Sequence, residues 1–502
     1  MSSRTLSMFI GPGAENIGLF HRLLSHGLGR IADNRRRTFD GDLSLYPDDH
    51  DFSADESDLR AALEQLFDRL EGSIPFFHPR YAAQMLKDPC IPALLGYTLT
   101  MLSNPNNHAY EGGPPTTEME MEVVDDLLRL IGFSSGWGHL TSGGSLANLE
   151  ALWAVRDRLR LPGGGRVPEK GRVLYSRASH LSWNRICRIL DIDSCRELPV
   201  DRDFRIDLNA LERELKSGPV LMVMANFGTT GCGAVDPISE IVRLREKYPF
   251  HLHVDAAYGG YFKSLLRDES NAIRPFERIE PDLSRYVYDQ ALALAEADSV
   301  TIDPHKHGLM PYGAGSVLYR HEDLRHVIQN TAPYTYHIKD RPNIGTFSLE
   351  GSRPGAAAAG CWMTHKLFPL NSAGLGAVLS GSLRTARTLH GSTEGLPDLV
   401  ALTRPDLDIF CFYIRKHQDD TLERLNERSL VLYDRFSVQN PSAPFFLSKL
   451  VIDPDTARRL VPDLSHGNES LIALRAVFIK HWIGLPRGEP ILHDLVSILE
   501  SL

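Results

Sequence analysis

Hydrophobic and polar positions change their spacing along the chain, and the change divides it into regions. Between about residues 137 and 320, short apolar runs of strand length alternate with segments whose apolar positions recur near the helical period. This alternation predicts an α/β fold, in which a mostly parallel sheet carries helices on both faces. The predicted strands are 172–176, 220–226, 251–257, 299–304 and 316–319, and the predicted helices between them are 208–216, 237–248 and 283–297.

The regions on either side of this alternation follow other patterns. Apolar residues between Leu59 and Leu70 have a helical spacing, and Thr-Glu-Met-Glu at 117–120 is a capping-box pattern that predicts a helix start before 121–131. Residues 328–355 predict a loop, and 355–368 predict a helix. We therefore predict a helical N-terminal segment (1–105), a large α/β domain (106–385) and a small α+β C-terminal domain (386–502) with strands at 408–413 and 473–479.

Charge and hydropathy exclude several functional classes. The 502 residues carry a formal net charge of −10, which argues against a nucleic-acid partner because phosphate neutralisation needs clustered Lys and Arg. The only tight basic run, Arg35-Arg36-Arg37, is better explained as a solvated helix end. No apolar stretch approaches the roughly 18 residues of a membrane span. Residues 1–4 do not begin a signal peptide, so we expect a cytoplasmic protein without a membrane partner.

The cysteines and histidines lack the spacing of metal or disulfide frameworks. The chain has no Cys-x-x-Cys pair, and its six cysteines are scattered, so we expect reduced, buried thiols. No His-Glu-x-x-His run or equivalent ligand spacing occurs, and no metal is predicted.

Polar motifs lie where strands end and where a helix begins. Lys306 follows one predicted strand in Asp-Pro-His-Lys-His, Asp255 closes another, and Gly143-Gly144-Ser145 precede an apolar helix. Ligands of parallel sheets bind outside the carboxyl ends of the strands, so these groups are expected to share a site. An amine can form an imine with an aldehyde, a carboxylate can pair with a protonated ring nitrogen, and backbone N–H groups at a helix start favour phosphate. Together they predict an enzyme that uses pyridoxal 5'-phosphate (PLP).

Each of these residues also has an ordinary structural explanation. A lysine at a strand end is commonly just exposed, an aspartate there is often a turn residue, and most Gly-Gly-Ser runs are simple turns. His180, which follows a predicted strand, is either a surface histidine or a ring that stacks on the cofactor. The presence of all of them in one chain favours the cofactor site.

These motifs resemble the group II PLP-dependent amino-acid decarboxylases, most firmly over residues 75–370. The closest likeness is to the bacterial tyrosine decarboxylases. The resemblance implies a PLP-dependent transferase-like fold (fold type I) and a homodimer that shares its active sites, with residues 1–105 in dimerisation. The further motifs that carry it are Asn-Pro-Asn-Asn at 104–107, Gly-Pro-Pro-Thr-Thr-Glu at 113–118, Trp-Gly-His-Leu at 137–140 and Leu-Glu-Gly-Ser at 349–352.

The resemblance also implies roles for individual residues. Lys306 would hold the cofactor, Asp255 would pair with its ring nitrogen, and His180 and Ala257 would pack on opposite faces of the ring. The other cofactor-binding residues implied are Gly143, Gly144, Ser145 and His305 around the phosphate, Thr230 and Asp303 near the cofactor, and Ser352 at the phosphate of a partner subunit.

A tyrosine of the loop after Lys306 is implied as the catalytic acid. Tyr334 falls where relatives carry a tyrosine on a mobile lid, which would exclude water and protonate the substrate carbon after CO₂ leaves. Tyr336 is a competitor for that role, and Tyr312 is a further candidate for the substrate side. Candidates for the wall around the substrate side chain are Tyr81, Tyr97, Asn106 and His108, although Tyr81 and Tyr97 are explained equally well by packing in the dimer core.

The expected reaction is decarboxylation of an L-amino acid, aromatic and tyrosine-like by family branch, to its amine and CO₂. One alternative is oxidative decarboxylation with deamination to an aldehyde, and another is a scaffold that keeps the fold without catalysis. Carbon–carbon lyase action is a weaker alternative, since Gly-Ser-Arg-Pro-Gly at 351–355 also resembles sphingosine-phosphate lyases. The chain departs from the tyrosine decarboxylases in a shorter C-terminal region and in Arg353, where those enzymes often have lysine.

Overall fold

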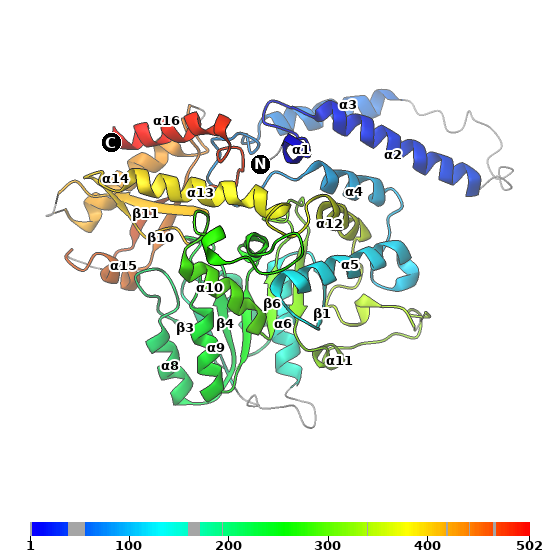
Figure 1. Cartoon of the computed structure of the whole chain (residues 1–502), viewed down its shortest axis with the longest axis horizontal. Helices are drawn as coiled ribbons and strands as arrows, with labels where there is room; N and C mark the ends of the chain where they lie inside the picture. Colours follow the sequence, from blue (N-terminus) through cyan, green and yellow to red (C-terminus); the bar gives the residue numbers. More distant parts are fainter. Residues whose placement is uncertain are drawn as a thin grey trace.

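A seven-stranded sheet forms the centre of the structure, a computed structural model that describes residues 3–38, 56–158, 171–192, 194–338, 340–417, 420–440, 442–464 and 468–501 (Figure 1). The strand order is β1-β7-β6-β5-β4-β2-β3, and β7 alone runs against the other strands. The strands are β1 (Trp137–Thr141), β2 (Arg172–Ser176), β3 (Cys195–Leu198), β4 (Val220–Asn226), β5 (His251–Asp255), β6 (Ser299–Ile302) and β7 (Gly315–Tyr319).

The central strands are fully buried because helices cover both faces of the sheet. Every residue of β4, β5, β6 and β7 is buried, as expected for the middle of a parallel sheet. The predicted α/β class is confirmed. The surrounding helices are α6 (Gly144–Arg158), α7 (Ser182–Ile189), α8 (Leu208–Ser217), α9 (Ile238–Lys247), α10 (Arg285–Ala293), α11 (Asp323–Val327) and α12 (Gly355–Leu367).

A second, antiparallel sheet follows in the C-terminal part, in the order β10-β11-β9-β8. Figure 1 shows it next to α13 and α16. The predicted boundary at residue 385 falls inside α13, and the division into three domains stays a prediction. The elements are β8 (Leu399–Ala401), β9 (Ile409–Ile414), β10 (Ser448–Ile452), β11 (Leu471–Val477), α13 (Leu375–Thr393), α14 (Leu422–Phe436), α15 (Pro454–Leu460) and α16 (Glu489–Glu500).

The N-terminal part is helical, with α1 (Ser3–Leu6), α2 (Ile17–Thr38), α3 (Glu56–Glu71) and α4 (Ile91–Met101). Helices α2 and α3 bury none of their residues and extend from the body of the molecule (Figure 1). Over the residues that the structure describes, no helix is long and apolar enough to cross a lipid bilayer.

The predicted helix start at residues 117–120 is wrong. Helix α5 (Pro114–Ile131) begins three residues earlier, directly after Gly113, and no side chain caps its first turn. Proline is tolerated in that first turn because its missing N–H would have no helical partner. Thr117 and Glu120 are therefore buried residues within α5, and the Glu120 carboxylate does not cap the helix start.

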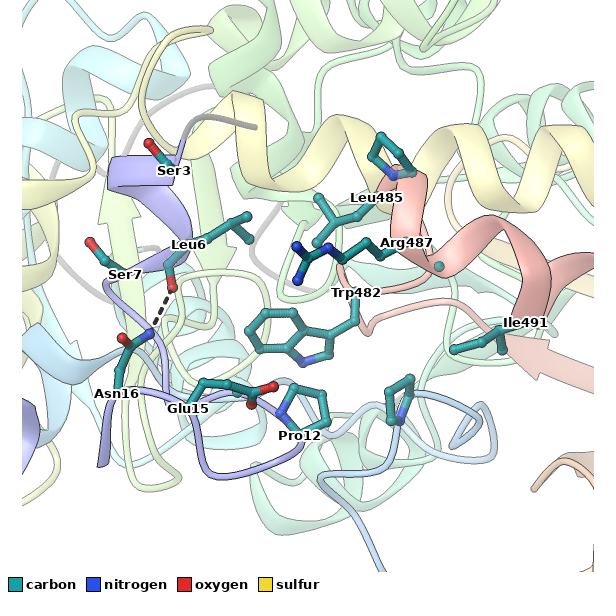
Figure 2. A pocket seen from close by; sticks show the side chains of 14 residues that line it. Ser3, Leu6, Ser7, Pro12, Glu15, Asn16, Trp482, Leu485, Arg487 and Ile491 are labelled. Atoms are coloured by element: carbon teal, nitrogen blue, oxygen red, sulfur yellow. Dashed lines mark hydrogen bonds between the residues drawn. The ribbon is translucent and has the colours of Figure 1, made fainter. Parts of the chain in front are cut away.

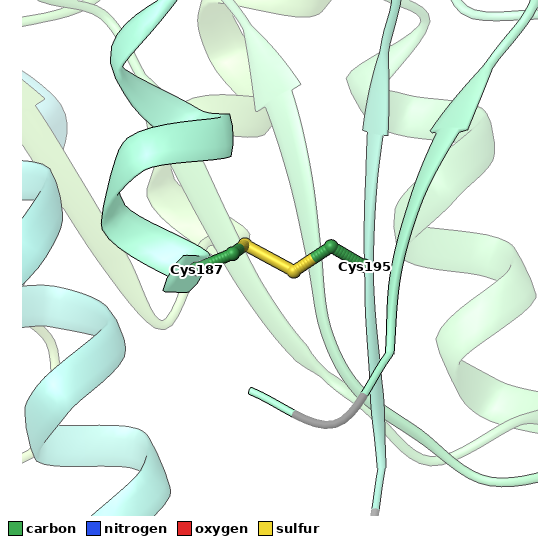
Figure 3. Close-up of a disulfide and its surroundings, with 2 residues drawn as sticks. All are labelled: Cys187 and Cys195. Carbon is green, nitrogen blue, oxygen red and sulfur yellow. A yellow bond between two sulfur atoms is a disulfide. The ribbon is translucent and has the colours of Figure 1, made fainter. Parts of the chain in front are cut away.

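The prediction of six reduced thiols is wrong for one pair. Cys187, near the end of α7, and Cys195, at the start of β3, form a disulfide (Figure 3). Their Cα atoms lie 6.6 Å apart, within the range that a disulfide spans. The return of the chain from α7 to the edge strand brings them together, and spacing alone does not reveal such a turn. Cys90, Cys232, Cys361 and Cys411 are free and buried, as predicted.

Candidate active site

A cavity of about 470 Å³ gathers most of the predicted site residues. It lies where β4, β5 and β6 end, as ligand sites of parallel sheets do. Tyr334 and Ser352 do not line it. The predicted residues that do are Gly143, Gly144, Ser145, His180, Thr230, Asp255, Ala257, Asp303, His305 and Lys306.

A second cavity, of about 680 Å³, lies between the N-terminal segment and residues 482–491 (Figure 2). Its wall combines Trp482 and Arg487 with Glu15, and among the described residues that line it there is no lysine. It therefore offers no amine to an aldehyde. In the part of the chain that the structure describes, no group of three His, Cys, Asp or Glu side chains could hold a metal ion.

The Lys306 side chain is enclosed beside a carboxylate. Its Nζ lies 3.1 Å from Oδ2 of Asp303, a residue that is only 2% exposed. Burial on its own would lower the pKa of Lys306, but the charges of Asp303 and Asp255 outweigh burial, and the net shift of the pKa is upward. The other oxygen of Asp303, Oδ1, is buried and has no hydrogen-bond partner among the described residues. An acceptor for a further donor is thus available next to the lysine.

Asp255 is fixed at the end of β5 by two donors. Asn148 Nδ2 donates to its Oδ2 over 2.7 Å, and the backbone N–H of Ala257 donates to its Oδ1 over 3.2 Å. Asn148 belongs to α6, which starts at Gly144, so helix and strand are tied together at the cavity.

The start of α6 lies close to Asp303 and Ala257 because its first residue, Gly144, has no side chain. A Cβ at Gly144 would lie 2.9 Å from Oδ2 of Asp303 and 3.1 Å from Cβ of Ala257, which is closer than side chains tolerate. The first backbone N–H groups of a helix lack helical acceptors and favour an anion. The end of the cavity formed by Gly143, Gly144 and Ser145 therefore suits an anion.

His180 enters the cavity as a neutral ring. The backbone N–H of Ser182 donates to its Nδ1 over 3.2 Å, so that nitrogen carries no proton. Burial lowers the pKa of His180, and the nearby Asp255 charge offsets only part of that effect.

Sequence reasoning missed several residues of the cavity wall. Asn148 lies one helical turn after Gly144, in the same motif, and Asn226 ends β4, so position supplied a signal for both. Tyr258 also lines the cavity. Tyr312, named from the sequence only as a candidate for the substrate side, lines it as well, and its ring packs against His305 at 4.5 Å between centroids.

The remaining predicted residues lie outside this cavity. Tyr334 is 81% exposed, whereas the Tyr336 hydroxyl is hydrogen-bonded to Nε2 of His108 over 2.6 Å. Ser352 Oγ accepts a hydrogen bond from Asn106 over 3.1 Å. Tyr81 and Tyr97 pack in the interior, Tyr81 beside Phe446, so neither forms a wall of the cavity in this chain.

A buried ion pair secures the segment that carries Ser352. Both terminal nitrogens of Arg353 donate to the Glu120 carboxylate, over 2.6 to 2.7 Å, and one of them also donates to the Leu140 carbonyl. Next to it, Glu350 accepts a hydrogen bond from the backbone N–H of Ser142 at the cavity rim. A planar guanidinium can make this paired contact and a lysine cannot.

Residues 44–415 match the family described as the pyridoxal-dependent decarboxylase conserved domain. The chain belongs to this family. The resemblance stated from the sequence motifs is thereby confirmed, and the protein is a PLP-dependent amino-acid decarboxylase.

Individual relatives agree with this family. The L-tyrosine decarboxylase of Enterococcus faecium is 31% identical over 520 residues, covering 86% of this chain and 85% of that protein. The L-aspartate decarboxylase of Thermococcus kodakarensis is 28% identical over 302 residues, covering 60% of this chain and 71% of that protein. TDC of Oryza sativa, solved with PLP and tryptamine, superposes with a TM-score of 0.71 at 18% identity, covering 97% of this chain and 99% of that one. The predicted fold type I is confirmed.

The cavity of the decarboxylase fits PLP at each of the cofactor's polar ends. It combines a lysine amine, a fixed carboxylate at a strand end and a glycine turn at a helix start. The glycine positions leave room that a Cβ would fill, and the unpartnered Oδ1 of Asp303 can accept a further hydrogen bond.

Proposed function

We propose that this decarboxylase converts an aromatic, tyrosine-like L-amino acid to its amine and CO₂. The observation that carries the proposal is the meeting of Lys306, Asp255 and the Gly143–Ser145 turn in one cavity. The aromatic side chain is favoured because the tyrosine decarboxylase of Enterococcus faecium aligns over most of both chains, whereas the aspartate decarboxylase aligns over a smaller part.

The predicted cofactor-binding residues have proposed roles toward PLP. Lys306 would bind the cofactor carbon through its amine, and Asp255 would pair with the ring nitrogen. His180 would cover one ring face and Ala257 the other. The remaining roles are Gly143, Gly144, Ser145 and His305 around the phosphate, Thr230 and Asp303 beside the cofactor, and Ser352 at the phosphate held by a partner subunit.

The chemistry divides between the cofactor and the chain. PLP, when bound, withdraws electrons from the substrate α-carbon, which allows CO₂ to leave. The chain would supply position and charge: the Asp255 carboxylate would pair with the ring nitrogen, and the neutral His180 ring would cover one face without adding a charge. Tyr334, on the loop after Lys306, would exclude water and return a proton to the α-carbon.

A homodimer is part of the proposal. Helices α2 and α3 expose large apolar side chains, among them Leu23, Leu59, Phe67 and Leu70, which a second subunit would cover. Tyr334 and Ser352 lie outside the cavity of their own chain, as expected of residues that act in a neighbour's site. The cytoplasmic location stays a prediction.

Product identification tests the proposed function. PLP-loaded protein is incubated with each common L-amino acid and with L-DOPA, and the products are identified by mass. We expect an amine from an aromatic substrate and none from aspartate or glutamate. An aldehyde formed with consumption of O₂ would replace the proposal with the oxidative reaction. No product from any amino acid, with PLP still bound, would exclude the proposed substrate class.

Asp303→Asn is expected to speed the attachment of PLP at neutral pH. The amine attacks an aldehyde only when it is neutral, so attachment becomes faster as pH rises through the pKa of Lys306. Asp303 holds that pKa up, and removing its charge lowers the pKa and enlarges the neutral fraction at any lower pH. The rate is measured by stopped-flow absorbance after PLP is mixed with the apoprotein. Asp289→Asn, an equal charge change at an exposed helix site, is the control. A rate equal to or below wild type in Asp303→Asn contradicts the argument.

A further inference from the structure

A relay of buried hydrogen bonds extends from Asp255 into the protein, away from the cavity. His251 Nε2 lies 2.8 Å from Ser299 Oγ, which lies 2.8 Å from His253 Nδ1. His253 Nε2 lies 3.0 Å from Asn148 Oδ1, and Asn148 Nδ2 donates to Asp255. None of the five side chains is more than 8% exposed.

Strand geometry explains why these residues meet. Residues 251, 253 and 255 alternate along β5, so their side chains share one face of the sheet. Ser299 is the register partner of His253 on β6, and Asn148 reaches the same face from α6. One short segment of strand thus places two histidines in line behind a carboxylate.

The directions of the hydrogen bonds in this relay follow from the carboxylate and from the neutral state of the two rings. A carboxylate only accepts, so Asn148 must turn its NH₂ toward Asp255 and its carbonyl toward His253. His253 must then carry a proton on Nε2. In a neutral ring its Nδ1 is bare and accepts from the Ser299 hydroxyl, and Ser299 in turn accepts from Nε2–H of His251.

The pKa values of the two histidines in the relay agree with neutral rings. Burial lowers the pKa of His253 to about 3, and it lowers that of His251 to about 4 despite the opposing charge of Asp298. Near neutral pH, neither ring places a positive charge beside Asp255. The two histidines therefore add no positive charge that would neutralise the carboxylate.

We propose that Asn148, His253, Ser299 and His251 are positioning residues that orient the Asp255 carboxylate toward the ring nitrogen of PLP without neutralising it. This inference rests on the proposed role of Asp255. His251, His253 and Ser299 do not line the cavity, whereas Asn148 borders it. They act through one carboxylate, so their loss weakens the cofactor's ring contact and spares substrate recognition.

PLP binding to the apoprotein tests the inference without relying on turnover. Hydrogen bonds to a charged group change an equilibrium constant by roughly 10- to 100-fold. We expect Asn148→Leu and His253→Phe to raise the Kd for PLP by that order and to lower kcat at saturating PLP, with KM for the amino acid unchanged. His253→Gln keeps an N–H donor and is expected to recover most of the loss. Ser299→Ala is expected to have a smaller effect in the same direction.

Ser316→Ala is the matched control. Ser316 is a buried serine on the adjacent strand β7, and its hydroxyl donates to the Ile302 carbonyl outside the relay. Thermal unfolding of each apoprotein shows whether a variant is folded. The inference is overturned if Asn148→Leu and His253→Phe bind PLP as tightly as Ser316→Ala, or if His253→Gln is no better than His253→Phe. The Kd of Asp255→Ala for PLP is measured alongside. If this variant binds PLP as tightly as wild type, the proposed role of Asp255 is wrong, and the inference about the relay fails with it.

Discussion

Lys306→Ala is expected to abolish decarboxylation and covalent attachment of PLP together. No other lysine among the described residues lines the cavity, so no second amine can replace it there. Removing a group that bonds covalently during turnover costs on the order of 10⁴-fold or more in kcat. The measurement is borohydride reduction of the PLP-loaded protein, followed by peptide mass spectrometry. In wild type the label should lie on the peptide that contains Lys306, and in Lys306→Ala it should disappear.

Lys306→Arg separates the loss of the amine from the loss of its charge. A guanidinium keeps a cation beside Asp303 but forms no imine, so this variant should be as inactive as Lys306→Ala. The exposed Lys449, which lies over the Tyr433 ring in the C-terminal part, provides the control Lys449→Ala with full activity. Label on a different peptide of the wild-type protein, or activity retained in Lys306→Arg, would show that another residue carries the cofactor.

Part of the cavity was predictable because the signals of some of its residues are local. Lys306 and Asp255 follow strands of a parallel sheet, where ligands bind, and Gly143 and Gly144 begin a helix. The strands themselves could be placed within a few residues, since β4 is an almost continuous apolar run of strand length. A side chain whose role depends on the end of a regular element can be assigned once that element is recognised.

Long-range pairings were not predictable in the same way. Glu120 appeared to cap a helix, but its carboxylate pairs with Arg353, more than two hundred positions along the chain. The bond between Cys187 and Cys195 depends on how the chain turns from α7 to β3. Asn148 lies one helical turn after Gly144, yet its importance comes from the contacts to Asp255 and His253, which only the packed sheet provides.

The structure favours one of the two loop tyrosines, Tyr334 and Tyr336, as the proton donor. Tyr336 has a left-handed backbone conformation, with φ of 63°, and its hydroxyl is bound to His108, whose Nδ1 is in turn bonded to the Gly351 carbonyl. Tyr334 is exposed and forms no hydrogen bond with any residue that the structure describes. A proton donor on a closing loop must move into the site, and Tyr334 can do so without breaking a hydrogen bond to a described residue.

Tyr334→Phe is therefore expected to lower kcat by roughly 10²- to 10⁴-fold, the usual contribution of a general acid. The ring is kept, so PLP binding should be unchanged. A larger share of aldehyde among the products is expected, because slower protonation leaves the electron-rich α-carbon available to O₂ for longer. Tyr336→Phe is the matched control, and we expect it to lose less than about tenfold in kcat. Steady-state rates and product masses decide between them. A larger loss in Tyr336→Phe would assign the acid to Tyr336 instead.

Mixed dimers test whether Tyr334 acts in the neighbouring subunit. Lys306→Ala removes the amine of its own site, and Tyr334→Phe removes the acid that its loop would deliver elsewhere. If the loop completes the partner's site, a dimer with one chain of each kind contains one site with both groups intact. Unfolding and refolding the two variants together should then recover activity that neither variant has alone. If Tyr334 acts within its own chain, every site of the mixed dimer lacks one group and the mixture stays inactive. Recovery would support both the homodimer and the role of Tyr334, whereas its absence, with mixed dimers verified by mass, would contradict a shared site.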